Sequence, residues 1–249
     1  MTATIVSAFV PLNTDLATSR PWDALSRAWL ALEDVPKVVF APRALAHGGR
    51  NITWVPFEPE ELPVAADGTR LPAERNPAKA TAEYMQLQLH KTTFLRRAAE
   101  SVPDGATRHW IWMDFGIFHI FGGDEPRFLA AVRRAAQNAP TCASTVRMPC
   151  IWPPAPDVSV EEAVAQGWMD RVLWHCAGGV FGGSGEALAR FDDAVQRVRE
   201  ELRACGRLAW EGNVWALAGA RCPDLISRFQ ADHDPRLLES YPNDDKKSE

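Results

Sequence analysis

Short runs of consecutive apolar residues alternate along this chain with longer segments whose apolar residues recur every three or four positions. The first run, residues 4–10, contains no polar alternation, which is typical of a strand buried on both faces of a sheet. Residues 21–33 show helical periodicity with Pro21 in the first turn, and residues 37–41 form a second apolar run. Strand, helix and strand in this order predict a parallel βαβ unit.

The same two patterns predict the remaining elements. Further strands are expected over residues 52–57, 108–114, 141–147 and 171–176. Further helices are expected over residues 83–100, 125–138, 159–170 and 188–205, with a last one that begins near Glu211 and ends before Pro223. Residues 58–80 and 150–157 have no period and many prolines, so we expect them to be loops.

Composition indicates an ordinary globular protein. The 249 residues are 46% apolar and 24% charged, and this length can bury a substantial core. We find no internal repeat and no domain boundary. The sequence therefore predicts one α/β domain over residues 1–240, with a mainly parallel central sheet flanked by helices, and a polar, disordered tail over residues 241–249.

Charge and cysteine content exclude several classes of protein. The net charge is −5 and basic residues form no stripe, which argues against a nucleic-acid partner. There is no apolar run of about 18 residues and no signal peptide, so we expect no transmembrane segment. The five cysteines are an odd number without a CxxC pair, which favours a reducing compartment over a disulfide framework or zinc ribbon. We therefore expect a cytoplasmic protein.

Asp114 has the best functional position in the chain. It directly follows the apolar run 109–113, and in open parallel sheets ligands bind beyond the carboxyl ends of the strands. The alternative is that Asp114 caps a turn before Gly116, since both are turn residues. We favour the functional interpretation.

Lys91 falls on the apolar stripe of a predicted helix, four residues after Leu87 and three before Phe94. A lysine at such a position either extends along the apolar surface to the rim or reaches into a site. The sequence leaves both possibilities open.

Glycines dominate residues 178–185, which precede a helix. The segment is neither a Walker A loop nor a clean Rossmann fingerprint. Glycine permits close approach of the backbone to a ligand, and a helix N-terminus attracts anions, so a role beside a phosphate or a sugar is physically reasonable. Paired glycines also mark simple tight turns. His175 comes just before this segment, and a lone histidine in an apolar run is more often a core residue than a catalyst.

Glu211 lies among tryptophans at the start of the last predicted helix. It either complements the helix dipole or binds sugar hydroxyls and accepts a proton in an apolar pocket. Ten tryptophans against two tyrosines are unusual, and tryptophan suits both cores and the walls of binding clefts. No HExxH or GxSxG motif is present, so a metalloprotease or a hydrolase triad is not indicated.

Three segments together resemble the YibB/HtrL-like family of bacterial proteins: residues 4–9, 110–116 and 177–183. Their order and spacing fit, a helix lysine such as Lys91 precedes the strand that ends in aspartate, and the resemblance covers most of residues 4–220. That family is similar to glycosyltransferases of the GT-A type. The resemblance therefore implies a GT-A-like nucleotide-binding sandwich that uses a nucleotide-sugar donor.

The resemblance also implies roles for single residues. Ser7, Ala8 and Phe9 after the first strand, and residues 40–43 up to Arg43 after the second, would flank the base and ribose. Lys91 would offset the charge of the donor diphosphate.

Further roles follow for the rest of the site. Asp114 would match the first acidic position of an Asp-x-Asp-like element. Gly178 and Gly179 would line the donor or acceptor sugar, and Glu211 would match the acidic residue that enters a late helix.

The Asp-x-Asp element is incomplete, because Gly116 occupies its third position. A single carboxylate can still hold a hydrated Mn²⁺ or Mg²⁺ when phosphates supply other ligands, so Asp114 is the candidate metal ligand. Lys91 is an alternative charge partner for the diphosphate.

The sequence thus favours a glycosyltransferase that moves a sugar from a nucleotide-sugar donor to a glycan or small-molecule acceptor. Asp114 and Glu211 are the expected catalytic residues: Asp114 would hold the diphosphate, and Glu211 would orient the acceptor or act as a base. The missing second aspartate motivates an alternative, a nucleotide- or carbohydrate-binding protein without turnover. A third possibility is a tryptophan-rich surface that binds a protein partner.

Overall fold

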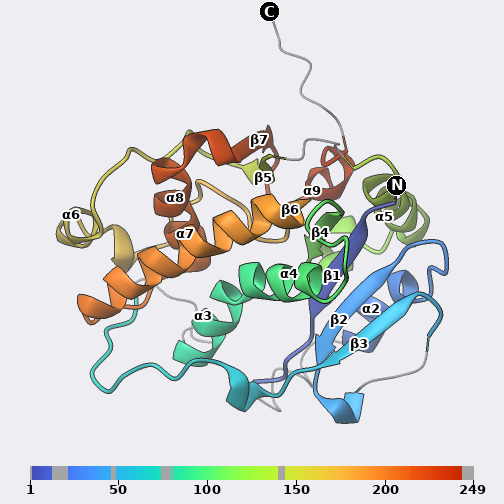
Figure 1. Cartoon of the computed structure of the whole chain (residues 1–249), viewed down its shortest axis with the longest axis horizontal. Coiled ribbons are helices and arrows are strands. Elements are labelled where there is room, and N and C mark those ends of the chain that lie inside the picture. The colour runs from blue at the N-terminus through green and yellow to red at the C-terminus, as the bar shows by residue number, and fades with distance from the viewer. Residues whose placement is uncertain are drawn as a thin grey trace, which may run out of the picture.

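The structure is a computed structural model that describes residues 2–12, 22–45, 49–73, 79, 81–139 and 144–242. Helices pack on both faces of a seven-stranded sheet, so the molecule has three layers (Figure 1). The strands are β1 (Thr4–Ala8), β2 (Lys37–Ala41), β3 (Ile52–Pro56), β4 (His109–Met113), β5 (Val146–Cys150), β6 (Val180–Ser184) and β7 (Ile226–Gln230).

The sheet order is β3-β2-β1-β4-β6-β5-β7. All neighbouring strands are parallel except that β6 runs antiparallel to both β4 and β5. The predicted α/β class with a mainly parallel sheet is therefore confirmed. After β1 the chain builds outward through β2 and β3, then returns to place β4 on the other side of β1. This reversal creates a topological switch point between β1 and β4.

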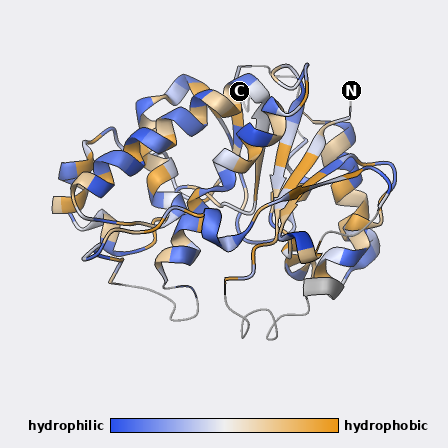
Figure 2. Cartoon of the chain, turned by 60° about the horizontal axis from the view of Figure 1, so that its bottom comes forward, coloured by the Kyte–Doolittle hydropathy of each residue, from blue (hydrophilic) through white to orange (hydrophobic). Residues whose placement is uncertain are grey.

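The two longest helices of the described chain are amphipathic, and hydrophilic and hydrophobic residues alternate along their turns (Figure 2). No helix within the described ranges is long and apolar enough to cross a membrane. The bounds of the helices are α2 (Trp22–Leu30), α3 (Ala82–Leu89), α4 (Lys91–Glu100), α5 (Glu125–Gln137), α6 (Val160–Ala165), α7 (Gly185–Ala204), α8 (Glu211–Arg221) and α9 (Arg236–Glu239).

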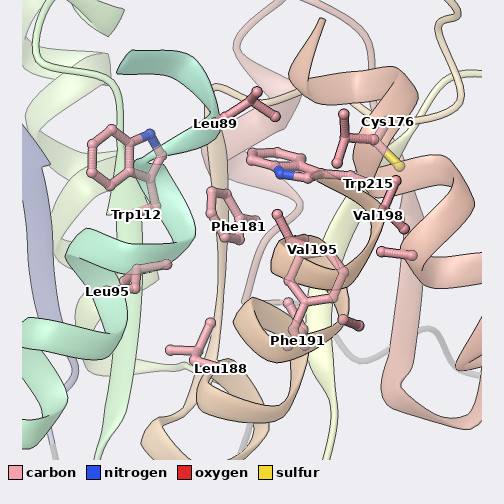
Figure 3. Packing of buried hydrophobic residues seen from close by; sticks show 14 of the residues in the cluster. Leu89, Leu95, Trp112, Cys176, Phe181, Leu188, Phe191, Val195, Val198 and Trp215 are labelled. Carbon is pink, nitrogen blue, oxygen red and sulfur yellow. The ribbon is translucent and has the colours of Figure 1, made fainter. Parts of the chain in front are cut away.

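Two hydrophobic clusters cover opposite faces of the sheet. Trp110 and Trp112 of β4 pack into the cluster formed with α4, α7 and α8, whereas Ile111 and Met113 pack into the cluster with α2, α5 and α9. Figure 3 shows the first cluster, in which side chains of α7 surround Phe181 of β6 and the α8 tryptophan. Strands β1, β2 and β4 are buried on both faces, which explains the apolar runs from which they were predicted.

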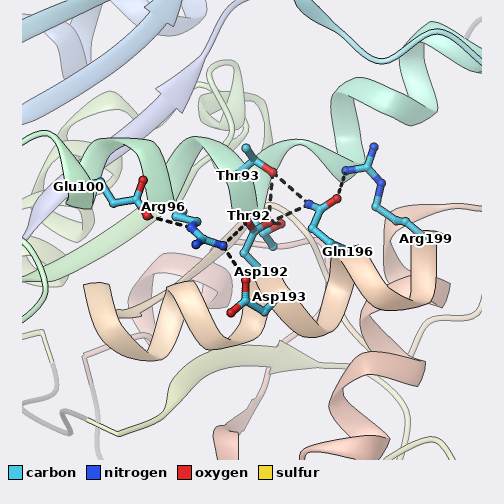
Figure 4. A network of polar contacts seen from close by, with 8 residues as sticks. All are labelled: Thr92, Thr93, Arg96, Glu100, Asp192, Asp193, Gln196 and Arg199. Carbon is cyan, nitrogen blue, oxygen red and sulfur yellow. Dashed lines mark hydrogen bonds and ion pairs between the residues drawn. The ribbon is translucent and has the colours of Figure 1, made fainter.

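A polar network fastens the first turn of α4 to α7 (Figure 4). The Asp192 carboxylate is 3% exposed, and its Oδ1 accepts hydrogen bonds from Thr92 Oγ1 at 2.7 Å, Thr93 Oγ1 at 3.1 Å and Gln196 Nε2 at 3.0 Å. Charge-assisted bonds of this kind are about twice as strong as neutral ones. The network fixes the turn that carries Lys91.

The predicted helix over residues 83–100 is divided at His90 into α3 and α4. His90 keeps a right-handed backbone (φ −79°, ψ −8°), and its N–H bonds to the carbonyl oxygens of both Gln86 and Leu87. The additional bond to Leu87 gives the last turn of α3 partial 3₁₀ character. The helix is interrupted there, and α4 begins as a separate helix.

Residues 171–176 are not a strand, contrary to the prediction. They cross the edge of the sheet, and the Leu173 N–H donates to Asn213 Oδ1 at 2.9 Å instead of joining a ladder. Strand β5 begins later than predicted, at Val146, and residues 140–143 lie outside the described part of the chain. Strand β7 was not predicted.

The glycine segment is a strand rather than a loop, because Gly182 and Gly183 lie inside the buried strand β6. A Cβ at Gly182 would lie 2.2 Å from the Trp110 carbonyl oxygen and 2.5 Å from the Tyr241 hydroxyl. At this position glycine allows neighbouring segments of the protein to pack closely. It does not make room for a ligand.

The domain extends past residue 240, where the tail was predicted to begin. Tyr241 is fully buried; its hydroxyl lies 2.7 Å from His109 Nε2, and its carbonyl oxygen accepts a 2.7 Å bond from Arg147 Nε. Buried apolar area and two hydrogen bonds therefore anchor this residue. The predicted tail from residue 243 onward lies outside the described residues.

Candidate functional site

The sheet topology brings several predicted site residues to one edge. Phe9 follows β1 and Asp114 follows β4, so both lie beyond carboxyl ends of neighbouring parallel strands. Gly178 and Gly179 precede β6, which is antiparallel, so its start lies at the same edge. All four residues line a cleft of about 710 Å³ at the switch point. This volume is in the usual range for small-molecule sites.

Lys91 is the centre of the cleft floor. Its side chain is 3% exposed, and its Nζ lies 3.0 Å from Asp114 Oδ1 and 3.6 Å from Glu211 Oε1. The same ammonium group donates to the Gly178 carbonyl oxygen at 3.1 Å and lies 5.9 Å from the centre of the Trp112 ring. Lys91 therefore reaches into the cleft rather than out to the rim.

Asp114 presents its carboxylate to the cleft and does not cap the following turn with it. The Asp114 carbonyl oxygen, not the side chain, accepts the bond from Ile117 N–H. Side-chain Oδ1 is held by Lys91 and by Trp112 Nε1, which donates at 2.7 Å. The side chain is 41% exposed, and Oδ2 lies 3.9 Å from the position that a Cβ of Gly179 would take. One oxygen is thus fixed while the other faces the open part of the cleft.

Glu211 is the first residue of α8, as predicted, and its side chain is 17% exposed. At this position the partial positive charge of the helix N-terminus stabilises an ionised carboxylate. A Cβ at Gly178 would lie 2.9 Å from Glu211 Oε1 and 3.3 Å from Lys91 Nζ. Glycine at 178 therefore allows the carboxylate, the ammonium group and the backbone carbonyl to meet.

Not every residue predicted to bind the base and ribose reaches the cleft. Ala8 and Phe9 line it, and the Phe9 ring stacks on Phe115 at 4.9 Å with an interplanar angle of 21°. Ser7 is fully buried, and its hydroxyl donates to the Met113 carbonyl oxygen at 2.6 Å, so it fastens β1 to β4.

Arg43 also lies away from the cleft lining. It is exposed in a short 3₁₀ turn (Arg43–Leu45), where its N–H donates to Glu58 Oε1 at 3.0 Å.

The N-terminus of α7 is not the anion site that the glycine segment suggested. Because β6 runs antiparallel, α7 begins at the opposite edge of the sheet. Its first N–H groups are already bonded: Gly185 to the Arg108 carbonyl, Glu186 to the Ala106 carbonyl, and a third to the Ser184 hydroxyl.

Sequence reasoning missed the far wall of the cleft. Trp174, His233 and Leu237 line it, together with His119. Residues 171–176 were taken for a strand and β7 was not recognised, so nothing in the pattern placed these side chains near Asp114. The tryptophan content was the one available signal.

A metal held by protein groups alone does not fit this site. The described residues contain no group of three or more His, Cys, Asp or Glu side chains placed to hold an ion. The two carboxylates of the cleft floor, Asp114 and Glu211, have the Lys91 ammonium group between them. Asp114 is the one described carboxylate of the floor that would remain as a single ligand for a hydrated cation brought by a bound phosphate.

Comparison of the chain with protein-family models and with curated proteins found no match. The fold and the geometry of the cleft are therefore the basis for assigning a function.

Proposed function

We propose that this protein is a nucleotide-sugar-dependent glycosyltransferase with a GT-A-like sandwich. The observation that carries the proposal is the convergence of Asp114 and Glu211 on Lys91 at the floor of a cleft beside the β1/β4 switch point. Nucleotides bind at switch points of open α/β sheets, which supports a nucleotide donor. The mixed sheet with helices on both faces agrees with the sandwich that the family resemblance implies.

The aromatic wall next to β1 is suited to a nucleobase. Phe9 and Phe115 form a stacked pair that lines the cleft, and Tyr84 and Trp210 stand on its other side with ring centres 6.3 Å apart. Flat aromatic side chains bind bases through stacking without selecting strongly among them. This wall would hold the base while the diphosphate extends over Lys91.

The charges of the cleft floor favour a divalent cation that arrives with the donor. Two carboxylates and one ammonium group, from Asp114, Glu211 and Lys91, sum to −1 among the described floor residues. This charge would repel a bare diphosphate. Asp114 would hold a Mn²⁺ or Mg²⁺ ion that arrives with the donor, and such an ion would supply positive charge to offset the diphosphate.

Glu211 is the candidate base. In the transfer, an acceptor hydroxyl oxygen forms a bond to the anomeric carbon while the bond from that carbon to the diphosphate oxygen breaks. The hydroxyl proton passes to the Glu211 carboxylate, which Lys91 orients at 3.6 Å. Asp114 holds the departing diphosphate in place.

Ligand-dependent stability tests the donor site. UDP, GDP, CMP and TDP, and their sugar conjugates, are added to the full chain with Mn²⁺ or with EDTA, and the melting temperature is measured. A ligand at 100 times its Kd stabilises the native state by about 2.7 kcal/mol. We expect one nucleotide to raise the melting temperature with Mn²⁺, little effect with EDTA, and loss of the effect in Asp114→Asn.

A measurement of turnover distinguishes a glycosyltransferase from a protein that only binds nucleotides. Donor hydrolysis or transfer by the wild type, retained nucleotide binding in Glu211→Gln and loss of turnover in that variant would support the assignment. Tight nucleotide binding without any turnover would support the non-catalytic alternative instead. If none of the nucleotides shifts the melting temperature under either condition, the proposal is wrong.

A further inference from the structure

The two exposed tryptophans in the described part of the chain come from segments that lie side by side. Trp152 is 43% exposed and Trp174 is 40% exposed, whereas the other exposed large apolar side chain there, Val64, lies elsewhere. The Trp152 N–H donates to the Trp174 carbonyl oxygen at 2.9 Å, which joins the two segments. Exposed aromatic side chains on adjoining segments are a feature of ligand- and partner-binding surfaces.

The sheet places these rings at the edge that carries Asp114. Strands β5 and β7 are parallel neighbours, and both run in the direction of β4 because β6 is antiparallel to β4 and to β5. Trp152 follows β5 and His233 follows β7, so both lie beyond carboxyl ends of strands. Trp174 and His233 line the same cleft as Asp114. The cleft therefore continues from the switch point to the end of β7, and Trp152 lies next to it through its backbone bond to Trp174.

Each tryptophan contacts a histidine edge to face. The Trp174 and His233 rings lie 4.6 Å apart at 82°, and the Trp152 and His175 rings lie 5.6 Å apart at 87°. We call these four residues the tryptophan–histidine platform.

Hydrogen bonds orient both imidazoles. His175 Nδ1 lies 2.6 Å from the Pro153 carbonyl oxygen, and His233 Nδ1 lies 3.1 Å from Asp232 Oδ1. Since a carbonyl or carboxylate oxygen can only accept, each Nδ1 carries a proton, and the Nε2 of each ring is the second polar atom that it presents. The platform thus combines apolar ring faces with polar atoms in fixed directions.

We propose that the tryptophan–histidine platform binds a saccharide ring, and that this ring belongs to the acceptor. A pyranose presents an apolar face of C–H groups and a rim of hydroxyl groups that both donate and accept, which matches tryptophan faces beside imidazole nitrogens. The binding site stands on the platform alone; its role as the acceptor site rests on the proposed glycosyltransferase activity.

The acidic side chains next to the platform are already paired or hydrogen-bonded within the protein. An aromatic cage for a cation usually adds negative charge. Here the Asp234 carboxylate is bound by Arg236 at 2.6 Å, and Asp232 is engaged by the N–H and the ring of His233. A neutral ligand rich in hydroxyl groups fits these surroundings better.

Gly179 connects the platform with the catalytic carboxylate. A Cβ at Gly179 would lie 3.2 Å from Leu237 Cδ1 and 3.9 Å from Asp114 Oδ2. Because the position has no side chain, the space between the platform side of the cleft and Asp114 stays open. A saccharide on the platform can therefore direct a hydroxyl group toward the donor site.

An immobilised oligosaccharide array tests the platform, with chains that end in glucose, galactose, N-acetylglucosamine, mannose, rhamnose or sialic acid. The full chain is applied with and without UDP and Mn²⁺, and calorimetry with the free oligosaccharide measures the Kd of each positive. We expect at least one saccharide to bind. Trp174→Ala should weaken it at least tenfold and Trp174→Phe two- to fivefold, because phenylalanine keeps part of the stacking surface.

Matched controls separate this inference from the donor site. Val64→Ala removes an apolar side chain that is 91% exposed and should leave saccharide binding unchanged. Trp174→Ala should keep its circular dichroism spectrum and its nucleotide binding. Saccharide binding that depends on Trp174, in a protein that binds no nucleotide, would support the platform and refute the donor site.

Other outcomes would overturn the inference. The platform does not bind saccharides if no chain on the array binds, or if Trp174→Ala binds as tightly as the wild type. Binding of tetramethylammonium that is lost in Trp174→Ala, without saccharide binding, would assign the platform to a cation. Self-association in sedimentation that is lost in Trp174→Ala would assign it to a second copy of the chain.

Discussion

Removing the ammonium group of Lys91 should destabilise the fold measurably. Lys91→Met keeps an unbranched apolar stem in a position that is 3% exposed, so the packing of α4 changes little. The substitution deletes the donor to the Gly178 carbonyl oxygen and the contacts with Asp114 and Glu211. Two carboxylates then face each other across the cleft floor without a counter-charge.

The expected loss is about 2–3 kcal/mol. Breaking a buried ion pair costs about 3–5 kcal/mol, and a buried carbonyl left without a donor costs about 1–3 kcal/mol. The ion-pair contribution must be reduced, because Asp114 is 41% exposed and water screens its charge. Since about 1 kcal/mol shifts the melting temperature of a chain of this size by about 2–4 °C, Lys91→Met should melt roughly 5–10 °C lower.

Urea unfolding followed by circular dichroism measures this loss. Lys79→Met is the matched control, because Lys79 lies at the cleft rim, 5.8 Å from the Tyr84 ring, and should cost about 0.5 kcal/mol. Adding Glu211→Gln to Lys91→Met should restore about 1 kcal/mol by removing one of the two facing charges. If Lys91→Met is as stable as the wild type, or if Glu211→Gln lowers its stability further, the electrostatic account of the cleft floor is wrong.

Three further perturbations follow from the same contacts. In Lys91→Ala the facing carboxylates lose the ammonium group between them, so Mn²⁺ alone should raise the melting temperature of the variant; an equal rise in the wild type without nucleotide would contradict this. Ser7→Ala removes the 2.6 Å bond to the Met113 carbonyl and should cost about 1–3 kcal/mol in urea unfolding, with no change in nucleotide affinity by calorimetry. Burial lowers the pKa of His90 and of His109 to about 4, below the ordinary 6.5 that each regains on unfolding. The unfolded state then binds more protons between these values, so the free energy of unfolding should fall as pH falls from 6.5 to 4, by up to about 1.4 kcal/mol per pH unit for each histidine. His109→Gln should remove the contribution of one histidine, up to about 1.4 kcal/mol per pH unit, from the slope of unfolding free energy against pH. An unchanged slope in urea unfolding at several pH values would show that His109 does not contribute.

Strands β1, β2 and β4 were predicted correctly because they are buried on both faces. Residues 109–113 place successive side chains in opposite clusters, so every position is apolar and the run is visible without knowledge of its neighbours. Lys91 and Asp114 were visible for a similar reason. A charge that interrupts an apolar stripe, or that ends an apolar run, stands out locally.

The elements that the sequence missed depend on distant partners. Residues 171–176 are apolar because Leu173 and Cys176 are buried, yet they join no ladder. The glycine segment, by contrast, forms β6 because the backbone of β4 and the Tyr241 hydroxyl approach closer than a Cβ would allow. No local sequence pattern indicates this close approach. Strand β6 was therefore interpreted as a loop, and the loop over residues 171–176 was interpreted as a strand.

Both errors concealed the same part of the cleft. With β6 recognised as antiparallel, the segment before it returns to the edge that carries Asp114 and brings Trp174 with it. The cleft then has two ends of different chemistry, which share one carboxylate. Asp114 Oδ1 is held by Lys91 and Trp112, while Oδ2 lies near Gly179 on the side of the platform. A single fixed carboxylate between an aromatic wall and the tryptophan–histidine platform is an arrangement suited to two substrates at once, which is why the donor and the saccharide sites should be tested by separate variants and then together.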